Sequence, residues 1–83
     1  ATITFGEERL ELTKNEFKIL EILLEHSGKI VAREDIMKRL WETDSYVDDN
    51  TLTVNVTRLR KKLEQVGLKD YIRTKKGVGY MVE

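Results

Sequence analysis

The sequence lacks cysteine and proline and has a single histidine, His26, among its 83 residues. Without cysteine it can form neither a disulfide framework nor a thiolate zinc site, and one histidine cannot build a histidine cluster. We therefore expect no metal and no cofactor. No apolar run approaches the roughly 20 residues that cross a membrane, and no charged-then-apolar leader opens the chain. These absences favour a cytoplasmic protein without membrane contact.

The length fits one small domain, residues 1–83, and leaves no room for a second. A core of this size is marginally stable, so nearly every apolar stripe should be needed for folding. Ala1 already falls within a predicted strand, which favours a domain excised from a longer protein. No repeat or low-complexity tract interrupts the chain.

Periodicity predicts an α+β order of strand hairpin, three helices and a second hairpin. Alternation over residues 3–12 predicts the first hairpin. The pair Thr13 and Glu16 forms a capping box, so the first helix should begin there and end at Ser27-Gly28. Its predicted buried face is Phe17, Ile19, Leu20, Leu23 and Leu24. A minimal strand at Ile30-Val31 precedes the second helix, whose predicted apolar face is Ile36, Met37, Leu40 and Trp41.

The third predicted helix spans about residues 49–65. Asp48 is a suitable N-cap, and Val47 is spaced from Leu52 as a hydrophobic staple. Gly67 sits where a left-handed C-cap is needed. One face carries the apolar stripe of Leu52, Val56, Leu59 and Leu63. The final hairpin, residues 72–82, turns around the segment KKGVG.

The zero net charge hides an asymmetric distribution. Residues 1–57 carry seven Lys or Arg against twelve acids, whereas residues 58–83 carry eight against three. The last third therefore has a net charge of +5 and the rest −5. A cationic segment of this kind favours a polyanionic partner such as nucleic acid.

The predicted third helix presents polar and basic residues opposite its apolar stripe, namely Thr51, Val54, Asn55, Arg58, Lys61 and Lys62. This face has the chemistry of base reading: arginine can bind guanine bidentately, asparagine can bind adenine, and Val54 or Thr51 can touch a thymine methyl group. The alternative is a solvated helix face whose cations complement the helix dipole.

The final hairpin adds cations beside a glycine-containing tip. Arg73, Lys75 and Lys76 surround it, Gly77 and Gly79 permit positive φ or close backbone approach, and Thr74 offers a hydroxyl donor for phosphate. Such a tip can enter a minor groove or hold phosphates. The alternative is an ordinary hairpin whose lysines protect an edge. A basic helix followed by this hairpin favours DNA binding.

Other residues leave two readings open. Arg60 lies near the core side of the third helix and could pair with the domain's own acids or reach DNA. Trp41 is expected to be a core anchor, with a phosphate contact through its indole N–H as the alternative.

The candidate catalytic residues, Asp48-Asp49, Glu7-Glu8 and His26, form no convergent catalytic set. We therefore expect no enzyme.

Three segments carry a family resemblance: LTKNEFKILEILLEHSGKIVAREDIMKRLW, VDDNTLTVNVTRLRKKL and IRTKKGVGYMV. They resemble the C-terminal winged-helix effector domain of OmpR/PhoB-class bacterial response regulators, over essentially the whole chain. VDDNTLTVNVTRLRKKL is most similar to regulators that answer cell-envelope or antimicrobial-peptide stress in Gram-positive bacteria. The resemblance implies a winged helix-turn-helix fold and sequence-specific double-stranded DNA binding in a two-component phosphorelay system. It places the helix at about 49–65 in the major groove and the wing, residues 72–82, in the minor groove.

The resemblance also implies partners and contacts. A receiver domain upstream would carry the phosphorylated aspartate supplied by a sensor kinase, and two tandem copies would bind direct-repeat promoter sites. The loop of Glu42, Thr43, Asp44, Ser45 and Tyr46 is either an RNA polymerase contact or a plain connector. A four-stranded sheet before the first helix is expected, of which this chain holds only part.

Residues and resemblance together give one candidate interface. Base reading is expected from Thr51, Val54, Asn55 and Arg58. Backbone or groove contacts are expected from Trp41, Asn50, Thr57, Arg60, Lys61, Lys62, Arg73, Thr74, Lys75, Lys76 and Gly77. Two positions depart from the family pattern: Lys76 stands where arginine is frequent, which loses the planar guanidinium, and Ala32 stands where Ser or Thr often caps the second helix. The rival function is a winged helix used for protein contact through its acidic part.

Overall fold

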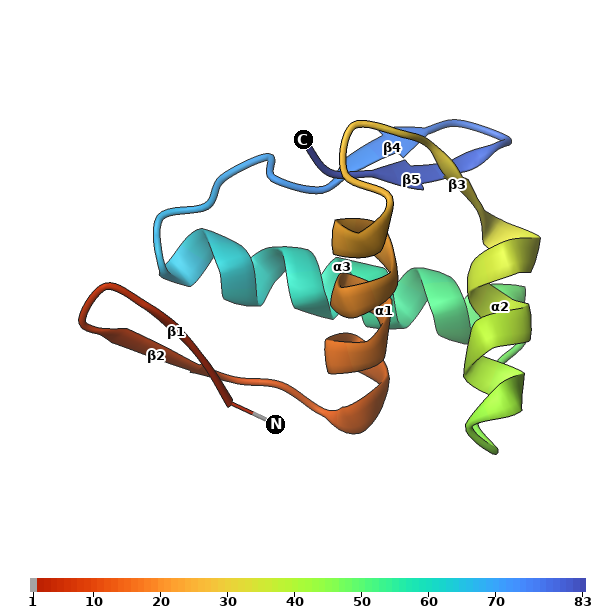
Figure 1. The fold of residues 1–83 in the computed structure, drawn as a ribbon, viewed down its shortest axis with the longest axis horizontal. Helices are drawn as coiled ribbons and strands as arrows, with labels where there is room; N and C mark the ends of the chain where they lie inside the picture. The colour runs from red at the N-terminus through yellow and green to blue at the C-terminus, as the bar shows by residue number, and fades with distance from the viewer. Residues whose placement is uncertain (1) are drawn as a thin grey trace.

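The computed structural model describes residues 2–83, and Ala1 lies outside the described part (Figure 1). The predicted α+β order of hairpin, three helices and hairpin is confirmed. The elements are β1 (Thr2–Phe5), β2 (Glu8–Glu11), α1 (Lys14–Glu25), β3 (Val31–Ala32), α2 (Arg33–Glu42), α3 (Asp49–Gln65), β4 (Arg73–Lys75) and β5 (Gly79–Met81). Within residues 2–83 no helix is long and apolar enough to cross a membrane.

The strands form two separate antiparallel sheets. β1 and β2 pair as a hairpin, whereas β3, β5 and β4 form a three-stranded sheet in that order. The short strand predicted at Ile30-Val31 lies one residue later, and Val31 pairs with Tyr80 of β5. This pairing ties the start of α2 directly to the wing, because β3 runs without interruption into α2.

Helix α1 begins at the predicted capping box. The Thr13 hydroxyl accepts the Glu16 N–H at 3.2 Å, and the Glu16 carboxylate accepts the Thr13 N–H at 2.9 Å. The predicted buried face was partly wrong: Leu24 is 47% exposed, Phe17 is only partly buried, and Ile22 is buried instead. Since α1 packs against both α2 and α3, its buried face turns toward Ile22 and away from Leu24.

Helix α3 is the long central helix of the domain (Figure 1). Its predicted stripe of Leu52, Val56, Leu59 and Leu63 is fully buried. A complete Schellman motif ends it: Leu68 N–H donates to Leu63 O at 2.9 Å, Gly67 N–H donates to Glu64 O at 3.1 Å, and Gly67 has φ 89°. Burial on one side fixes which residues α3 turns outward.

Candidate nucleic-acid interface

The outer face of α3 presents exposed side chains with unused donors. Thr51, Val54, Arg58 and Lys61 are all exposed. Within residues 2–83, neither Arg58 nor Lys61 has a side-chain hydrogen bond or ion pair. A guanidinium and an ammonium that lack internal partners remain available to a guanine edge or a phosphate.

Two residues on or beside that face donate side-chain hydrogen bonds to the backbone of α3. The Asn55 amide donates to Thr51 O at 2.8 Å, and the Thr57 hydroxyl donates to Thr53 O at 2.9 Å. Asn55 is only partly exposed, so it lies at the margin of the face. Its second N–H and its oxygen are the atoms left for an adenine edge. Asn50 is exposed in the first turn of α3.

The N-terminus of α3 is closed by its predicted cap. The Asp48 carboxylate accepts the Thr51 N–H at 2.7 Å. This hydrogen bond from the Thr51 backbone lowers the pKa of Asp48 below its ordinary value. The cap therefore holds a negative charge at the positive end of the helix.

The wing uses its two glycines in different ways. Gly77 has φ 76°, and the turn closes through Val78 N–H donating to Lys75 O at 2.9 Å. Gly79 has an ordinary φ, but a Cβ there would overlap the Val31 carbonyl oxygen across the sheet. Positive φ and close approach, both predicted from KKGVG, are thus found at one glycine each.

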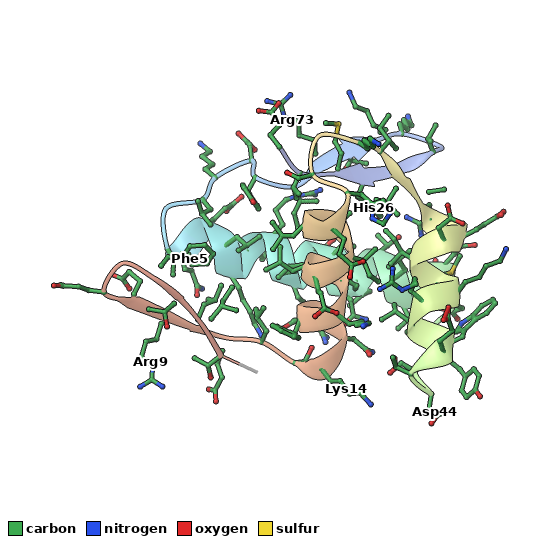
Figure 2. The ribbon with its side chains drawn as sticks, in the orientation of Figure 1. Phe5, Arg9, Lys14, His26, Asp44 and Arg73 are labelled. Carbon is green, nitrogen blue, oxygen red and sulfur yellow. The ribbon has the colours of Figure 1, made fainter. Side chains whose placement is uncertain are left out.

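The cations of the wing divide into paired and free. Lys75 and Lys76 are exposed and have no side-chain partner in the described part of the chain. Arg73 projects outward from the sheet (Figure 2) and pairs with Glu83 at 2.9 Å. The tip of the wing therefore offers two free ammonium groups, and Arg73 is partly neutralised by the C-terminal residue.

Arg60 joins α3 to the wing. Its guanidinium donates to the Thr74 hydroxyl at 2.7 Å. Pairing with the domain's own acids, one of the two sequence readings, is wrong for this structure. Both residues were expected to contact DNA, and here each is the other's partner.

Lys62 lies elsewhere than its predicted face. Its ammonium donates to the Glu16 carboxylate at 2.5 Å and to Glu11 O at 3.1 Å, on the side toward α1 and β2. Placing it on the outer face was wrong, because the buried Glu16 carboxylate draws it inward. Burial raises the pKa of Glu16, but the hydrogen bonds from Lys62 and from Thr13 N–H outweigh this and lower it.

Trp41 is not the core anchor that periodicity predicted. It is 43% exposed, and its indole N–H donates to Val47 O at 3.1 Å. That N–H is therefore used inside the protein. With Tyr46, Val47 and Asp48, Trp41 lines a shallow open groove beside the start of α3.

The loop between α2 and α3 has a defined shape with an exposed aromatic side chain. The Thr43 hydroxyl donates to Leu40 O at 2.8 Å, and Asp44 adopts a left-handed backbone conformation with φ 62°. Tyr46 is 79% exposed, although Val47 next to it is buried. Figure 2 shows Asp44 at the end of α2 that is remote from the wing.

Arg33, the first residue of α2, makes the densest set of contacts near the interface, and sequence reasoning missed it. It donates to Asp49 O at 2.7 Å, to the Thr53 hydroxyl at 2.9 Å and to the Tyr80 hydroxyl at 2.6 Å, and it pairs with the Asp49 carboxylate at 3.2 Å. A cation at the positive end of a helix is unfavourable without a local partner. That conflict was the available signal.

A helix pair, α2 and α3, followed by a β-hairpin that packs on the strand before α2 defines the winged helix-turn-helix class. The model for the family described as transcriptional regulatory protein, C terminal, matches residues 6–82. The chain therefore belongs to that family, whose members regulate transcription and are not enzymes. The predicted resemblance to OmpR/PhoB-class response regulators is confirmed.

Known proteins show the same relationship in more detail. The chain is 55% identical over 74 residues to the sensory transduction protein BceR of Halalkalibacterium halodurans, covering 89% of this chain and 32% of that one. It thus spans about a third of that relative's length. The solved C-terminal domain of the nisin resistance regulator NsrR, a lantibiotic response regulator, is 45% identical with TM-score 0.91, covering 99% of this chain and 84% of that chain. This agrees with the predicted antimicrobial-peptide subgroup.

A third likeness is to a structure with DNA. The DNA-binding domain of Klebsiella pneumoniae RstA, solved in complex with the RstA box, is 31% identical to this chain with TM-score 0.79. The match covers 98% of this chain and 81% of that chain.

Proposed function

We propose that this domain binds double-stranded DNA with sequence specificity, α3 in the major groove and the wing on the minor groove and its phosphates. One observation carries the proposal: Arg58 and Lys61 of α3 and Lys75 and Lys76 of the wing are exposed and have no side-chain partner among residues 2–83. Each can therefore meet a base or a phosphate without first breaking an internal bond. The RstA domain of similar fold in complex with its DNA box supports the same reading.

The residues have different duties in this proposal. Arg58 reads a base edge, and Val54 and Thr51 on the same face contact bases beside it. Lys61, Lys75 and Lys76 neutralise phosphates, which supplies affinity without sequence information. Further backbone or groove contacts are proposed for Asn50, Thr57, Arg60, Arg73, Thr74 and Gly77, and a marginal base contact for Asn55.

Single substitutions separate these duties. A duplex selected from random DNA by the wild-type domain and a scrambled duplex of equal length are the two probes. Arg58→Ala should cost about 1–3 kcal/mol on the selected duplex and little on the scrambled one, whereas Lys75→Ala should weaken both alike. Lys38→Ala is the control, because Lys38 is exposed on α2 beside His26 and Ile30, away from α3's outer face. Equal losses on both duplexes for Arg58→Ala remove Arg58 from the reading set.

Family membership also supports a proposal about the longer protein to which this domain would belong. We propose that residues 1–83 form the single effector domain of a cytoplasmic two-component response regulator with an upstream receiver domain that a sensor kinase phosphorylates. Two copies would then bind direct-repeat promoter sites in tandem, since linkage raises the effective concentration of the second copy. The similarity to NsrR supports a role in the response to antimicrobial peptides.

A second contact is proposed for the loop of residues 42–46, with RNA polymerase. Tyr46 supports it, because a 79% exposed aromatic side chain beside two acidic residues is suited to a partner with basic and apolar surface. In the full-length regulator, Tyr46→Ser should leave DNA affinity unchanged and reduce transcription from the regulated promoter. A loss of DNA affinity as large as the reduction in transcription would assign Tyr46 to the DNA interface instead.

A further inference from the structure

Arg33 lies where three elements meet. Its backbone N–H donates to Val78 O in the wing at 3.1 Å, and Ala32 before it pairs with Gly79. Its side chain extends to the first turns of α3, where it reaches Asp49 and Thr53. One residue therefore contacts both proposed DNA-binding elements.

The guanidinium holds the two elements with separate nitrogens. Nη1 donates to the Tyr80 hydroxyl of β5, while Nη2 donates to Asp49 O and the Thr53 hydroxyl of α3. The guanidinium also lies 5.7 Å from the centre of the Tyr80 ring. The guanidinium is rigid and planar, so its N–H groups point in fixed directions. Hydrogen bonds from these groups to both elements therefore hold α3 in one position relative to β5.

The side chain has little left for an outside ligand. It is 25% exposed, and Nε, Nη1 and Nη2 all have acceptors within the domain. These four hydrogen bonds use four of the five N–H donors of the guanidinium, so a phosphate could bind only the second N–H of Nη1 unless it displaced one of these acceptors. This sets Arg33 apart from Arg58, which is exposed and has no side-chain partner in the part of the chain that the structure describes.

We propose that Arg33 is a positioning residue that sets the spacing between α3 and the wing, so that both reach one DNA site in register. The proposal rests on the DNA binding proposed above. A wing displaced relative to α3 loses its own contacts, whereas α3 keeps its place in the major groove. Substitution of Arg33 should therefore reduce DNA protection at the end of the footprint that the wing covers.

The test uses the selected duplex and four variants, of which Arg33→Met removes the charge of Arg33 altogether. Arg33→Lys keeps the charge and removes the planar fork, and Tyr80→Phe removes one acceptor while keeping the buried ring. Arg39→Lys is the matched control: Arg39 is also on α2 and forms a two-bonded ion pair, with Glu25, at 3.0 and 3.4 Å. Thermal unfolding identifies a temperature at which all variants are folded, and binding and hydroxyl-radical footprints are measured there.

We expect Arg33→Lys to lower affinity for the selected duplex about tenfold and Tyr80→Phe to lower it severalfold. In both, protection by α3 should persist while protection at the wing's end fades, and Arg39→Lys should match the wild type. Two results together would show that Arg33 contacts a phosphate and that the proposal fails. Arg33→Lys would bind like the wild type, and Arg33→Met would reduce by about one the slope of log affinity against log salt concentration. An affinity loss with uniformly weaker protection also overturns it. Wild-type protein that binds no DNA refutes the proposed function itself, before any variant is compared.

Discussion

Arg60 on α3 and Thr74 on β4 are joined by a hydrogen bond of 2.7 Å between residues 14 positions apart. Together with Arg33, this bond links α3 to the wing at a second point. Arg33 acts at the N-terminal end of α3, and Arg60 acts nearer its C-terminal end. The relative placement of the two elements is therefore set by polar side chains as well as by the apolar core.

The Arg60–Thr74 bond predicts coupled effects on DNA binding. Arg60→Ala and Thr74→Val should each weaken binding to the selected duplex, and the double variant should lose less than the two single losses added. The expected coupling is about 0.5–3 kcal/mol, as for residues in direct contact. A double-mutant cycle in binding free energy measures it. Additivity within about 0.5 kcal/mol would show that the two side chains act independently on DNA.

Lys61 and Lys62, neighbours in sequence, should behave oppositely. Lys62→Met strands the buried Glu16 carboxylate, so the free energy of unfolding should fall by about 1–3 kcal/mol. The 30% exposure of Lys62 keeps this below the cost of breaking a fully buried pair. Lys61→Met should change stability by less than about 0.5 kcal/mol and lower the salt slope of DNA binding by about one.

Urea unfolding and salt titration of both lysine variants provide the two readouts. A reduced salt slope for Lys62→Met at unchanged stability would restore Lys62 to the DNA interface. An unchanged slope for Lys61→Met would remove Lys61 from it.

The two wing glycines predict unequal costs on substitution. Gly79→Ala should lower the free energy of unfolding by about 3 kcal/mol or more, because its Cβ would overlap the Val31 carbonyl oxygen. A Cβ at Gly77 would meet open space, so Gly77→Ala should lower the free energy of unfolding only through the positive φ, by about 1–2 kcal/mol. Equilibrium unfolding of both variants makes the comparison. Equal costs would contradict the close packing of β5 on β3.

Acid stability should depend in part on Glu16. Because the folded-state pKa of Glu16 lies below its ordinary value of 4.5, its ionised form stabilises the fold fully above that value. This contribution is lost as pH falls through the folded-state pKa. The stability gap between wild type and Glu16→Gln should therefore narrow below about pH 4.5. Glu8→Gln, which removes an exposed carboxylate from β2, is the control; parallel curves for wild type and Glu16→Gln would contradict this role.

Local sequence signals predicted the helices of the fold well. Spacing of Leu52, Val56, Leu59 and Leu63 by four, three and four residues defined the buried face of α3, because helical periodicity depends only on near neighbours. Capping at Thr13, Asp48 and Gly67 was likewise readable, since each cap bonds within a few residues.

Long-range pairings were less accessible to sequence reasoning. The pairing of Val31 with Tyr80 joins strands 49 positions apart, and Lys62 meets Glu16 across 46. Neither pairing produces a periodic pattern in the sequence. The pairing of Val31 with Tyr80 was therefore not predicted, and Lys62 was placed on the outer face of α3. Arg33 was overlooked for the same reason, although its position at a helix N-terminus was a signal. Sequence reasoning thus predicted the exposed cations of the candidate site, but it did not predict the hydrogen bonds that position the elements carrying them.

The most direct measurement of the central claim is DNA affinity as a function of salt, on the selected duplex and on its scrambled counterpart. If α3 reads bases while Lys61, Lys75 and Lys76 hold phosphates, log affinity should fall steeply and linearly with log salt on both duplexes. The selected duplex should stay at least about tenfold tighter, because each mismatched base pair costs roughly 1–3 kcal/mol. Equal affinity for the two duplexes, or binding indifferent to salt, would contradict the account.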